Sequence, residues 1–448
     1  MMQKENKMGV MSVPRLVVSM SLPIMISMLV QSLYNIVDSV FVAQISESAL
    51  TATSIAYSAQ MLQIAVAVGT GVGVNALVSR SLGAKRFEDA DAAATAGLVL
   101  TILSSLVFVL WGIFGTEAFI SRFTDDPAIL ADGIAYLHIC QIFATGIFLG
   151  TLTQRLLQAT GRTFLSMMAQ IAGAVVNLAL DPILIFGLFG CPEMGISGAA
   201  IATVIGQWVA AIAGLTLHFV QNKEVHFRIR YLIPKKQHIA AIYKVGAPTI
   251  LTQAFGSIMI ALMNMALVMF STTAVAFFGV YFKLQSFLFM PMNGLGQGSL
   301  PIVSYNFGAR KPDRIRQTCR TALTVGVGIA LAGMVVFLIF PHGLLTLFHA
   351  SDAMREIGVP ALRIISITFV LSAVTMIVGY VISGLGNGMV NMIGTALRQV
   401  VILIPAVFVF GQIGGIHMVW FAFWISEICA CSFAVYHLRK YLKKIEQL

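Results

Sequence analysis

The chain has 448 residues, of which 58% are hydrophobic and only 10% charged, and its mean hydropathy is +0.89. This composition excludes an ordinary water-soluble protein with one core and indicates an all-α integral membrane protein. The net charge of +10 could suggest a nucleic-acid partner, but the basic residues cluster between the apolar runs, at alternate ends of the expected helices. By the positive-inside rule, the pattern predicts a multi-pass protein of the inner (plasma) membrane with both termini cytoplasmic and no nucleic-acid partner.

Twelve apolar runs are long enough to cross a bilayer as helices. The expected spans lie near residues 14–43, 52–80, 92–115, 129–157, 163–190, 194–220, 239–269, 274–303, 317–341, 355–384, 388–411 and 415–437. A single long polar stretch separates the sixth span from the seventh. We therefore expect an N-terminal six-helix lobe (1–222), a cytoplasmic linker (223–238) and a C-terminal six-helix lobe (239–448).

The two halves of the chain repeat each other at an offset of 225 residues. Matching positions include two glycine clusters, two Gly-Ala-base turns and several single residues: Gly69 to Gly73 with Gly294 to Gly298, Gly83-Ala84-Lys85 with Gly308-Ala309-Arg310, and Pro23, Gln60 and Gly161 with Pro248, Gln285 and Gly386. Six spans return the chain to its starting side, so the lobes should be related by a pseudo-twofold axis along the membrane normal. The four-residue spacing of the glycines predicts close helix packing and argues against a phosphate-binding loop.

Two aspartates occur inside apolar spans of the first half. Asp38 follows Tyr34 by one helical turn in the first span, and Asp181 follows Asn177 by one turn in the fifth. An Asp near the centre of a membrane helix costs roughly 2.5 to 3.5 kcal/mol on insertion scales, so it usually faces a bundle interior or a wet cavity. The 225-residue offset places Met263 and about Ala406 at the matching positions. An acid pair confined to one lobe, in the outer half of the bilayer, predicts a dedicated ion site.

The chemistry of this pair leaves two ions open. Two carboxylates in one apolar site repel each other, so at least one should hold a proton more readily than a free carboxylate does. The same oxygens with the Asn177 amide would also suit Na+, in which case Asp38, Asn177 and Asp181 become metal ligands. We rank H+ first and expect no other cofactor. The alternative interpretation is that the acids only hydrogen-bond across helices, and the roles of Glu427, Lys283, Arg363 and Arg398 stay open.

Three motifs carry a resemblance to a known family. Leu-Tyr-Asn-x-x-Asp ends at Asp38, Leu-Gly-Ala-Lys-Arg covers residues 82–86, and Asn-x-x-x-Asp-Pro covers residues 177–182. The chain resembles the multidrug and toxic compound extrusion (MATE) family, in its DinF-like branch. The resemblance implies export of lipophilic, often cationic, drugs by alternating access, driven by entry of H+ or Na+. It also implies that Asp38, Asn177 and Asp181 form the coupling site, with Tyr34 as its hydrogen-bonding tyrosine and Thr203 as its sixth-span threonine.

Other functional classes fit the sequence less well. A flippase for a lipid-linked precursor shares the superfold but would need basic residues in its cavity, and few bases lie inside the spans. No metal, hydrolase or cysteine motif indicates an enzyme. We expect a monomeric antiporter whose partners are small drugs and membrane lipid, with substrate-binding residues that the sequence does not identify.

Overall fold

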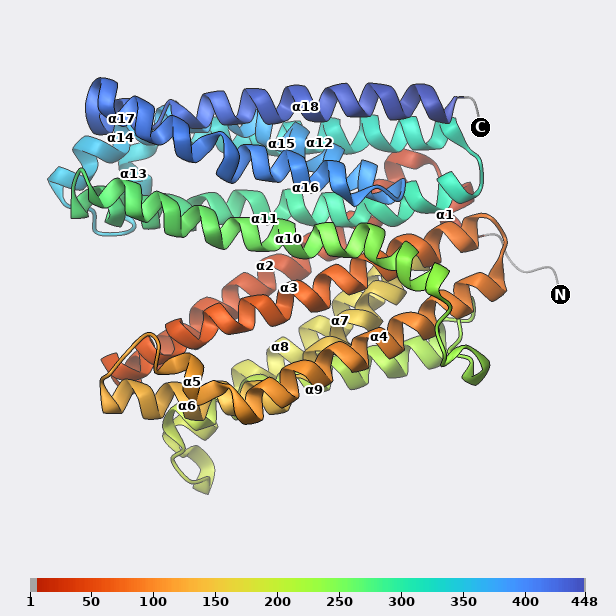
Figure 1. Ribbon diagram of the computed structural model, residues 1–448, viewed down its shortest axis with the longest axis horizontal. Coiled ribbons are helices and arrows are strands. Elements are labelled where there is room, and N and C mark those ends of the chain that lie inside the picture. The colour runs from red at the N-terminus through yellow and green to blue at the C-terminus, as the bar shows by residue number, and fades with distance from the viewer. Residues whose placement is uncertain (1–5, 447–448) are drawn as a thin grey trace. The chain divides into compact units, whose positions relative to one another are not determined.

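The structure is a computed structural model that describes residues 6–446 (Figure 1). Residues 1–5 and 447–448, at the two ends that we expect to be cytoplasmic, lie outside this range. Within it, nine helices are long and apolar enough to cross a membrane, and two bent helix pairs raise the number of spans to eleven. The last helix, α18 (Ala422–Ile445), has 24 residues but is less apolar, because it contains Glu427 and basic residues in its final turns. The expected all-α membrane fold is thus confirmed.

The described residues form two compact units. Unit 1 holds Asn6 and Ile26–Ile250, and unit 2 holds Lys7–Met25 and residues 251–446. The divisions fall inside α2 (Val13–Ile45) and α10 (Lys236–Val268), in each case two residues after a proline, Pro23 or Pro248. Each of these helices therefore begins in one unit and ends in the other. The beginning of α2 thus belongs to unit 2 and the beginning of α10 to unit 1, an exchange of helix beginnings. The compact units therefore differ from two consecutive halves of the chain.

Unit 1 contains most of the first repeat. Its remaining helices are α3 (Glu47–Gly83), α4 (Phe87–Phe114), α5 (Thr116–Ile120), α6 (Pro127–Ile142), α7 (Thr145–Ala159), α8 (Thr163–Phe186), η1 (Leu188–Gly190), α9 (Gly195–Gln221) and η2 (Ile229–Tyr231). Helices α6 and α7 form one span that bends by 48°. Helices α3, α6, α7, α8 and α9 pack on one another and enclose the unit's interior.

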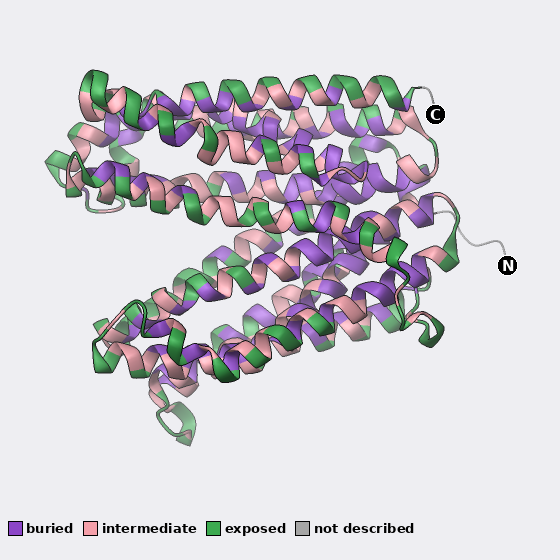
Figure 2. Ribbon diagram, in the orientation of Figure 1, coloured by how far each residue is buried: buried purple, intermediate pink, exposed green. Residues whose placement is uncertain are grey.

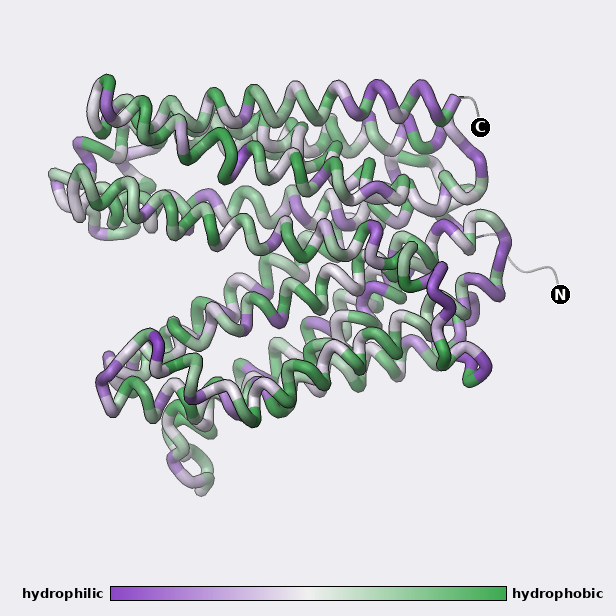
Figure 3. The backbone as a smooth tube through the Cα atoms, viewed as in Figure 1, coloured by the Kyte–Doolittle hydropathy of each residue, from purple (hydrophilic) through white to green (hydrophobic). Residues whose placement is uncertain are grey.

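Unit 2 contains most of the second repeat. Its remaining helices are α1 (Lys7–Val10), α11 (Thr272–Gly308), α12 (Pro312–Ile339), α13 (Pro341–Thr346), α14 (Asp352–Ser366), α15 (Phe369–Gly384), α16 (Gly388–Ala396), the π-helical turn η3 (Leu397–Val401), α17 (Leu403–Val419) and α18. Helices α14 and α15 form one span that bends by 49°, like its counterpart in unit 1. Figure 3 shows apolar residues along the helices, with hydrophilic residues gathered near helix ends such as the last turns of α18.

The repeat is visible in the contacts of the folded chain. In unit 1 the Ser79 hydroxyl donates to the carbonyl oxygen of Ala159 at 3.1 Å, and in unit 2 the Ser304 hydroxyl donates to that of Gly384 at 2.7 Å. Both partners are shifted by the same 225 residues. The turns after α3 and α11 also match, because Lys85 and Arg310 both adopt left-handed backbone conformations. The internal repeat is thereby confirmed.

The glycine clusters provide close helix packing, as their spacing predicts. A Cβ atom built on Gly73 of α3 would lie 2.2 Å from the carbonyl oxygen of Ile242 in α10. A Cβ atom on Gly298 of α11 would lie 2.7 Å from the Cα atom of Ser21 in α2. Figure 2 shows the surrounding helix segments as largely buried. Gly73 therefore lets the beginning of α10 pack closely within unit 1, and Gly298 lets the beginning of α2 pack closely within unit 2.

We predict that Gly73→Ala and Gly298→Ala each destabilise the protein, because the added methyl group meets backbone that cannot move aside. Overpacking of this kind typically costs about 1 to 3 kcal/mol. The matched control is Gly328→Ala in α12, where a Cβ atom would meet nothing within 4 Å. Thermal unfolding of the purified protein should show lower midpoints for the first two variants alone. Equal midpoints for all three would contradict the packing role.

Candidate cation site

The predicted site residues come together inside unit 1. The second half of α2 carries Tyr34 and Asp38, and α8 carries Asn177 and Asp181. Asp181 is fully buried and Asn177 is 4% exposed, whereas Tyr34 and Asp38 are partly buried. Pro182 lies inside α8 and cannot donate a hydrogen bond to the carbonyl group of Leu178, which adds an acceptor one turn from the acids.

The two carboxyl groups lie within hydrogen-bonding reach of each other. The Asn177 side-chain amide donates to Asp181 Oδ1 at 3.3 Å. Three buried oxygens accept no hydrogen bond from any described residue: Asp38 Oδ1, Asn177 Oδ1 and Asp181 Oδ2. No basic side chain of residues 6–446 forms an ion pair with either aspartate. The site therefore has an excess of acceptors and of negative charge.

The remaining predicted residues take less direct positions. The Tyr34 hydroxyl lies within hydrogen-bonding reach of Gln31, while both aspartates lie close enough to interact with it electrostatically. Gln31 in turn accepts a hydrogen bond from Gln170 of α8 at 2.9 Å. Thr203 of α9 lies within hydrogen-bonding reach of Tyr136, which itself stands near Asp38. Thr203 thus approaches the acids through a second side chain.

Sequence reasoning missed two neighbours of Asp38, Tyr136 and Cys140, and the Gln60 side chain that lies within reach of both. Tyr136 of α6 is 5% exposed and lies within hydrogen-bonding reach of both Thr203 and Gln60, and Cys140 stands one turn along the same helix. The sequence contained one signal, since Gln60 is a polar residue inside a span and recurs as Gln285. For Tyr136 and Cys140 we find no comparable signal, because single residues of these types are common in membrane bundles.

The arrangement suits a small cation. A proton placed between the carboxyl groups of Asp38 and Asp181 would turn a repulsive contact into a charge-assisted hydrogen bond. A hard metal cation such as Na+ would find three oxygens without donors and would need further oxygen ligands to replace its water. The residues therefore fit either ion, and they fit the proton with fewer additional ligands.

Unit 2 has a related polar cluster with a different charge balance. The offset of 225 residues places Glu427 of α18 opposite Ala202, next to Thr203. Glu427 is 5% exposed and accepts a hydrogen bond from Ser372 at 2.6 Å, and the Arg398 guanidinium lies 3.7 Å from the same carboxylate oxygen. Arg398 belongs to the π-helical turn η3, and such turns are frequent at functional sites. In unit 2 the positive charge beside the buried acid is therefore supplied by a side chain of the protein itself.

The other intramembrane bases stand apart from both clusters. Lys283 of α11 and Arg363 of α14 are exposed, and neither forms an ion pair within the part of the chain that the structure describes. Their exposed positions are typical of long basic side chains whose charged ends reach towards water.

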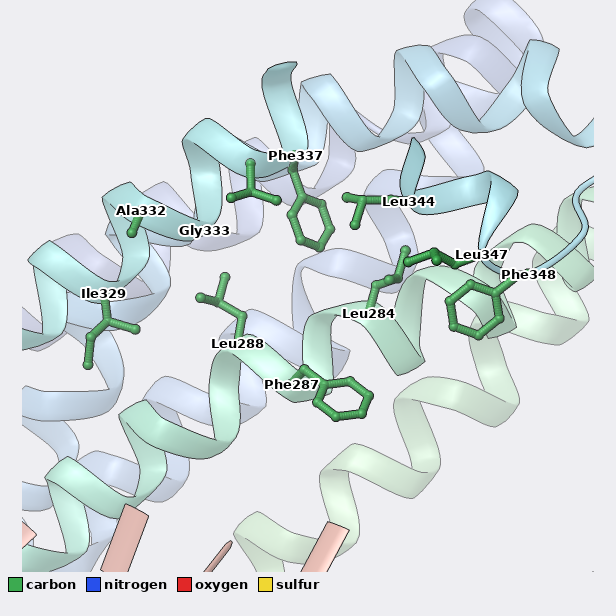
Figure 4. A pocket seen from close by; sticks show the side chains of 11 residues that line it. Leu284, Phe287, Leu288, Ile329, Ala332, Gly333, Phe337, Leu344, Leu347 and Phe348 are labelled. Atoms are coloured by element: carbon green, nitrogen blue, oxygen red, sulfur yellow. The ribbon is translucent and has the colours of Figure 1, made fainter. Parts of the chain in front are cut away.

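A cavity of about 630 Å³ lies elsewhere in unit 2, between α11, α12 and α13 (Figure 4). It is lined by apolar residues alone: Leu284, Phe287, Leu288, Ile329, Ala332, Gly333, Val336, Phe337, Leu344, Leu347 and Phe348. Without a polar side chain it offers no ligand to an ion. The cavity and the cation chemistry are therefore separate features of the molecule.

Comparison with known proteins identifies the same two-part plan. The model of the MatE family matches residues 23–183 and 248–409, so its two matches begin at Pro23 and Pro248. A curated relative, the multidrug export protein MepA of Staphylococcus haemolyticus (strain JCSC1435), is 25% identical over 427 residues, covering 94% of this chain and 93% of its own.

Solved structures of similar fold cover nearly the whole chain. One is described as the outward-facing conformation of a multidrug resistance MATE family transporter of the MOP superfamily; its TM-score is 0.93 at 23% identity, covering 100% of this chain and 99% of the other. Another, described as MATE in the bent conformation, has a TM-score of 0.90 at 25% identity and covers 97% of both chains.

We predict that Glu427→Gln destabilises unit 2, because it leaves the Arg398 guanidinium buried without its carboxylate. Removing one partner of a buried ion pair typically costs about 3 to 5 kcal/mol. The double variant Glu427→Gln/Arg398→Gln should recover most of the loss, as judged by thermal unfolding of the purified protein. If the double variant is no more stable than Glu427→Gln, the two side chains are not coupled.

Proposed function

Because the chain belongs to the MatE family, we propose that it is an antiporter that exports small lipophilic and cationic drugs in exchange for an entering cation. The observation that carries the proposal is the set of three buried oxygens without donors at Asp38, Asn177 and Asp181. An exchangeable cation would supply the positive charge that these oxygens lack. The name of the curated relative, a multidrug export protein, supports drugs as the exported class.

The proposed coupling ion is H+, with Na+ as the second choice. One proton bonds to one carboxyl group and is shared with the other, so it needs no ligand beyond Asp38 and Asp181. Na+ would need the Asn177 oxygen and further ligands, and the Thr203 and Tyr136 hydroxyl groups already lie within reach of each other.

The proposed transport cycle is alternating access, with α2 as the element that responds to the cation. Asp38 lies on the half of α2 that belongs to unit 1, and Pro23 lies just before the point where α2 leaves unit 2. A proline weakens a helix at its own turn because it lacks an N–H group. Binding of the cation would therefore change the packing of the helix that joins the two units, and the drug would bind the other state more tightly.

The proposed orientation places both termini and the linker after α9 on the cytoplasmic side of the cell membrane. The basic residues between spans support this assignment. A flippase for a lipid-linked precursor would require bases beside the substrate path, whereas the candidate site of unit 1 is acidic, so the structure supplies no argument for that alternative.

We predict that Asp38→Asn and Asp181→Asn each abolish drug uptake into inverted proteoliposomes driven by a pH gradient, because neither variant can exchange the shared cation. The double variant should be little worse than either single variant, since residues that act as one site give non-additive losses. The matched control is Glu47→Gln, which removes an exposed acid at the start of α3. Uptake of a fluorescent cation measures all four proteins. Near-normal transport by Asp38→Asn would contradict the proposal.

A further inference from the structure

The linker between α9 and α10 is fixed firmly to unit 1. We call residues 222–236 the strap, which ends at the first residue of α10. Asp91 of α4 accepts a hydrogen bond from the backbone N–H group of His226 at 2.8 Å and pairs with Arg228 at 2.9 Å. The Asn6 side chain donates to Glu224 at 2.7 Å, and Val225 is buried. These contacts fix the backbone of the strap, so the side chains that do not face unit 1 are kept on its outer surface.

The strap nevertheless exposes large apolar side chains. Ile229 is 86% exposed, Ile233 is 89% exposed, and Leu232 between them is 48% exposed. The strap has no spare length to fold back over them, because its two ends continue directly into α9 and α10. Both helices cross the membrane, so the strap lies at the level where the lipid headgroups begin. Exposed isoleucines at that level are typical of segments that enter the membrane interface.

The charged residues around these side chains are mainly basic, and some of them have no acidic partner among the described residues. Arg228 pairs with Asp91 and Arg230 pairs with Glu88. Lys235 and Lys236, which follow Ile233 after a single proline, are exposed and form no ion pair within residues 6–446. A contrasting apolar residue is Phe189, which is 91% exposed in the loop after α8 and has no base within three positions on either side. The strap therefore combines exposed apolar groups with uncompensated positive charge.

We propose that the strap is a docking surface for anionic phospholipid of the cytoplasmic leaflet. Ile229 and Ile233 enter the boundary between headgroups and acyl chains, and Lys235 and Lys236 contact the lipid phosphates. Basic residues attract an anionic leaflet over a short range, and the apolar side chains supply the area that is buried. The assignment rests on the cytoplasmic orientation proposed above, but not on the cation site.

The test uses the full-length protein in nanodiscs made from phosphatidylcholine and phosphatidylglycerol. Native mass spectrometry counts the two lipids that stay bound when the protein is released. Wild type should retain phosphatidylglycerol preferentially, and Lys235→Gln/Lys236→Gln should lower that preference by roughly fivefold per lysine, which corresponds to about 1 kcal/mol for each charge. Ile229→Ser/Ile233→Ser should lower the total number of retained lipids.

The matched controls separate the strap from general charge and general apolar exposure. Lys443→Gln/Lys444→Gln removes two exposed lysines at the end of α18, beside the buried Ile445, and should leave the preference unchanged. Phe189→Ser should also change nothing. Displacement of phosphatidylglycerol by inorganic phosphate would show that the strap binds a free anion and would overturn the lipid assignment. Equal retention of both lipids by wild type, or equal losses in the strap and α18 variants, would overturn it as well. Drug transport by the strap variants reports separately on the proposed antiport.

Discussion

The approach of the Asp38 and Asp181 carboxyl groups inside unit 1 sets the requirement that the rest of the structure must meet. No base pairs with either acid in the described part of the chain, and the Asn177 amide donates only one hydrogen bond to them. Such a pair is unfavourable when both groups are charged, because burial removes the water that would stabilise them. We propose that a bound cation relieves this cost, so that occupancy of the site can signal a conformational change.

The second repeat also buries a carboxyl group, but it balances the negative charge in a different way. Glu427 lies beside the position that matches Thr203, and the Arg398 guanidinium supplies its positive charge. A cation that belongs to the chain cannot be exchanged with the solution. The two repeats thus share a helical plan, while among the described residues only the first has a buried acid pair without a basic partner. Because α2 carries Asp38 and crosses between the units just after Pro23, a cation bound there would act on the helix that both units share.

Much of this architecture could be predicted from the sequence, because it depends on residue types that have few other uses inside a membrane. The glycine spacing predicted the tight contacts of α3 and α11, and the isolated Asp38 and Asp181 predicted that the two acids would face a common interior. The exchange of helix beginnings could not be predicted, since it depends on which partner each half of α2 and α10 packs against. Tyr136 was also missed, because its role comes from the neighbours that folding brings to it.

The π-helical turn at Arg398 is another feature that could not be predicted from the sequence. Its sequence resembles an ordinary span, and only the fold shows that the extra residue in the turn accompanies a guanidinium directed at Glu427. The offset of 225 residues could not predict this turn or its arginine, because the matching segment of α8 is a regular helix without a basic residue. Sequence comparison of the two halves therefore found the missing aspartates but not the ion pair that stands in their place.

Infrared spectroscopy of the purified protein tests the central claim most directly, because the C=O stretch of a protonated carboxyl group is separate from the bands of a carboxylate. The account predicts a protonated-carboxyl band at neutral pH in the wild type and in Glu427→Gln/Arg398→Gln. The band should be absent from Asp38→Asn/Asp181→Asn. A wild-type spectrum without the band, or a band that persists in the variant lacking both aspartates, would contradict a proton held between Asp38 and Asp181.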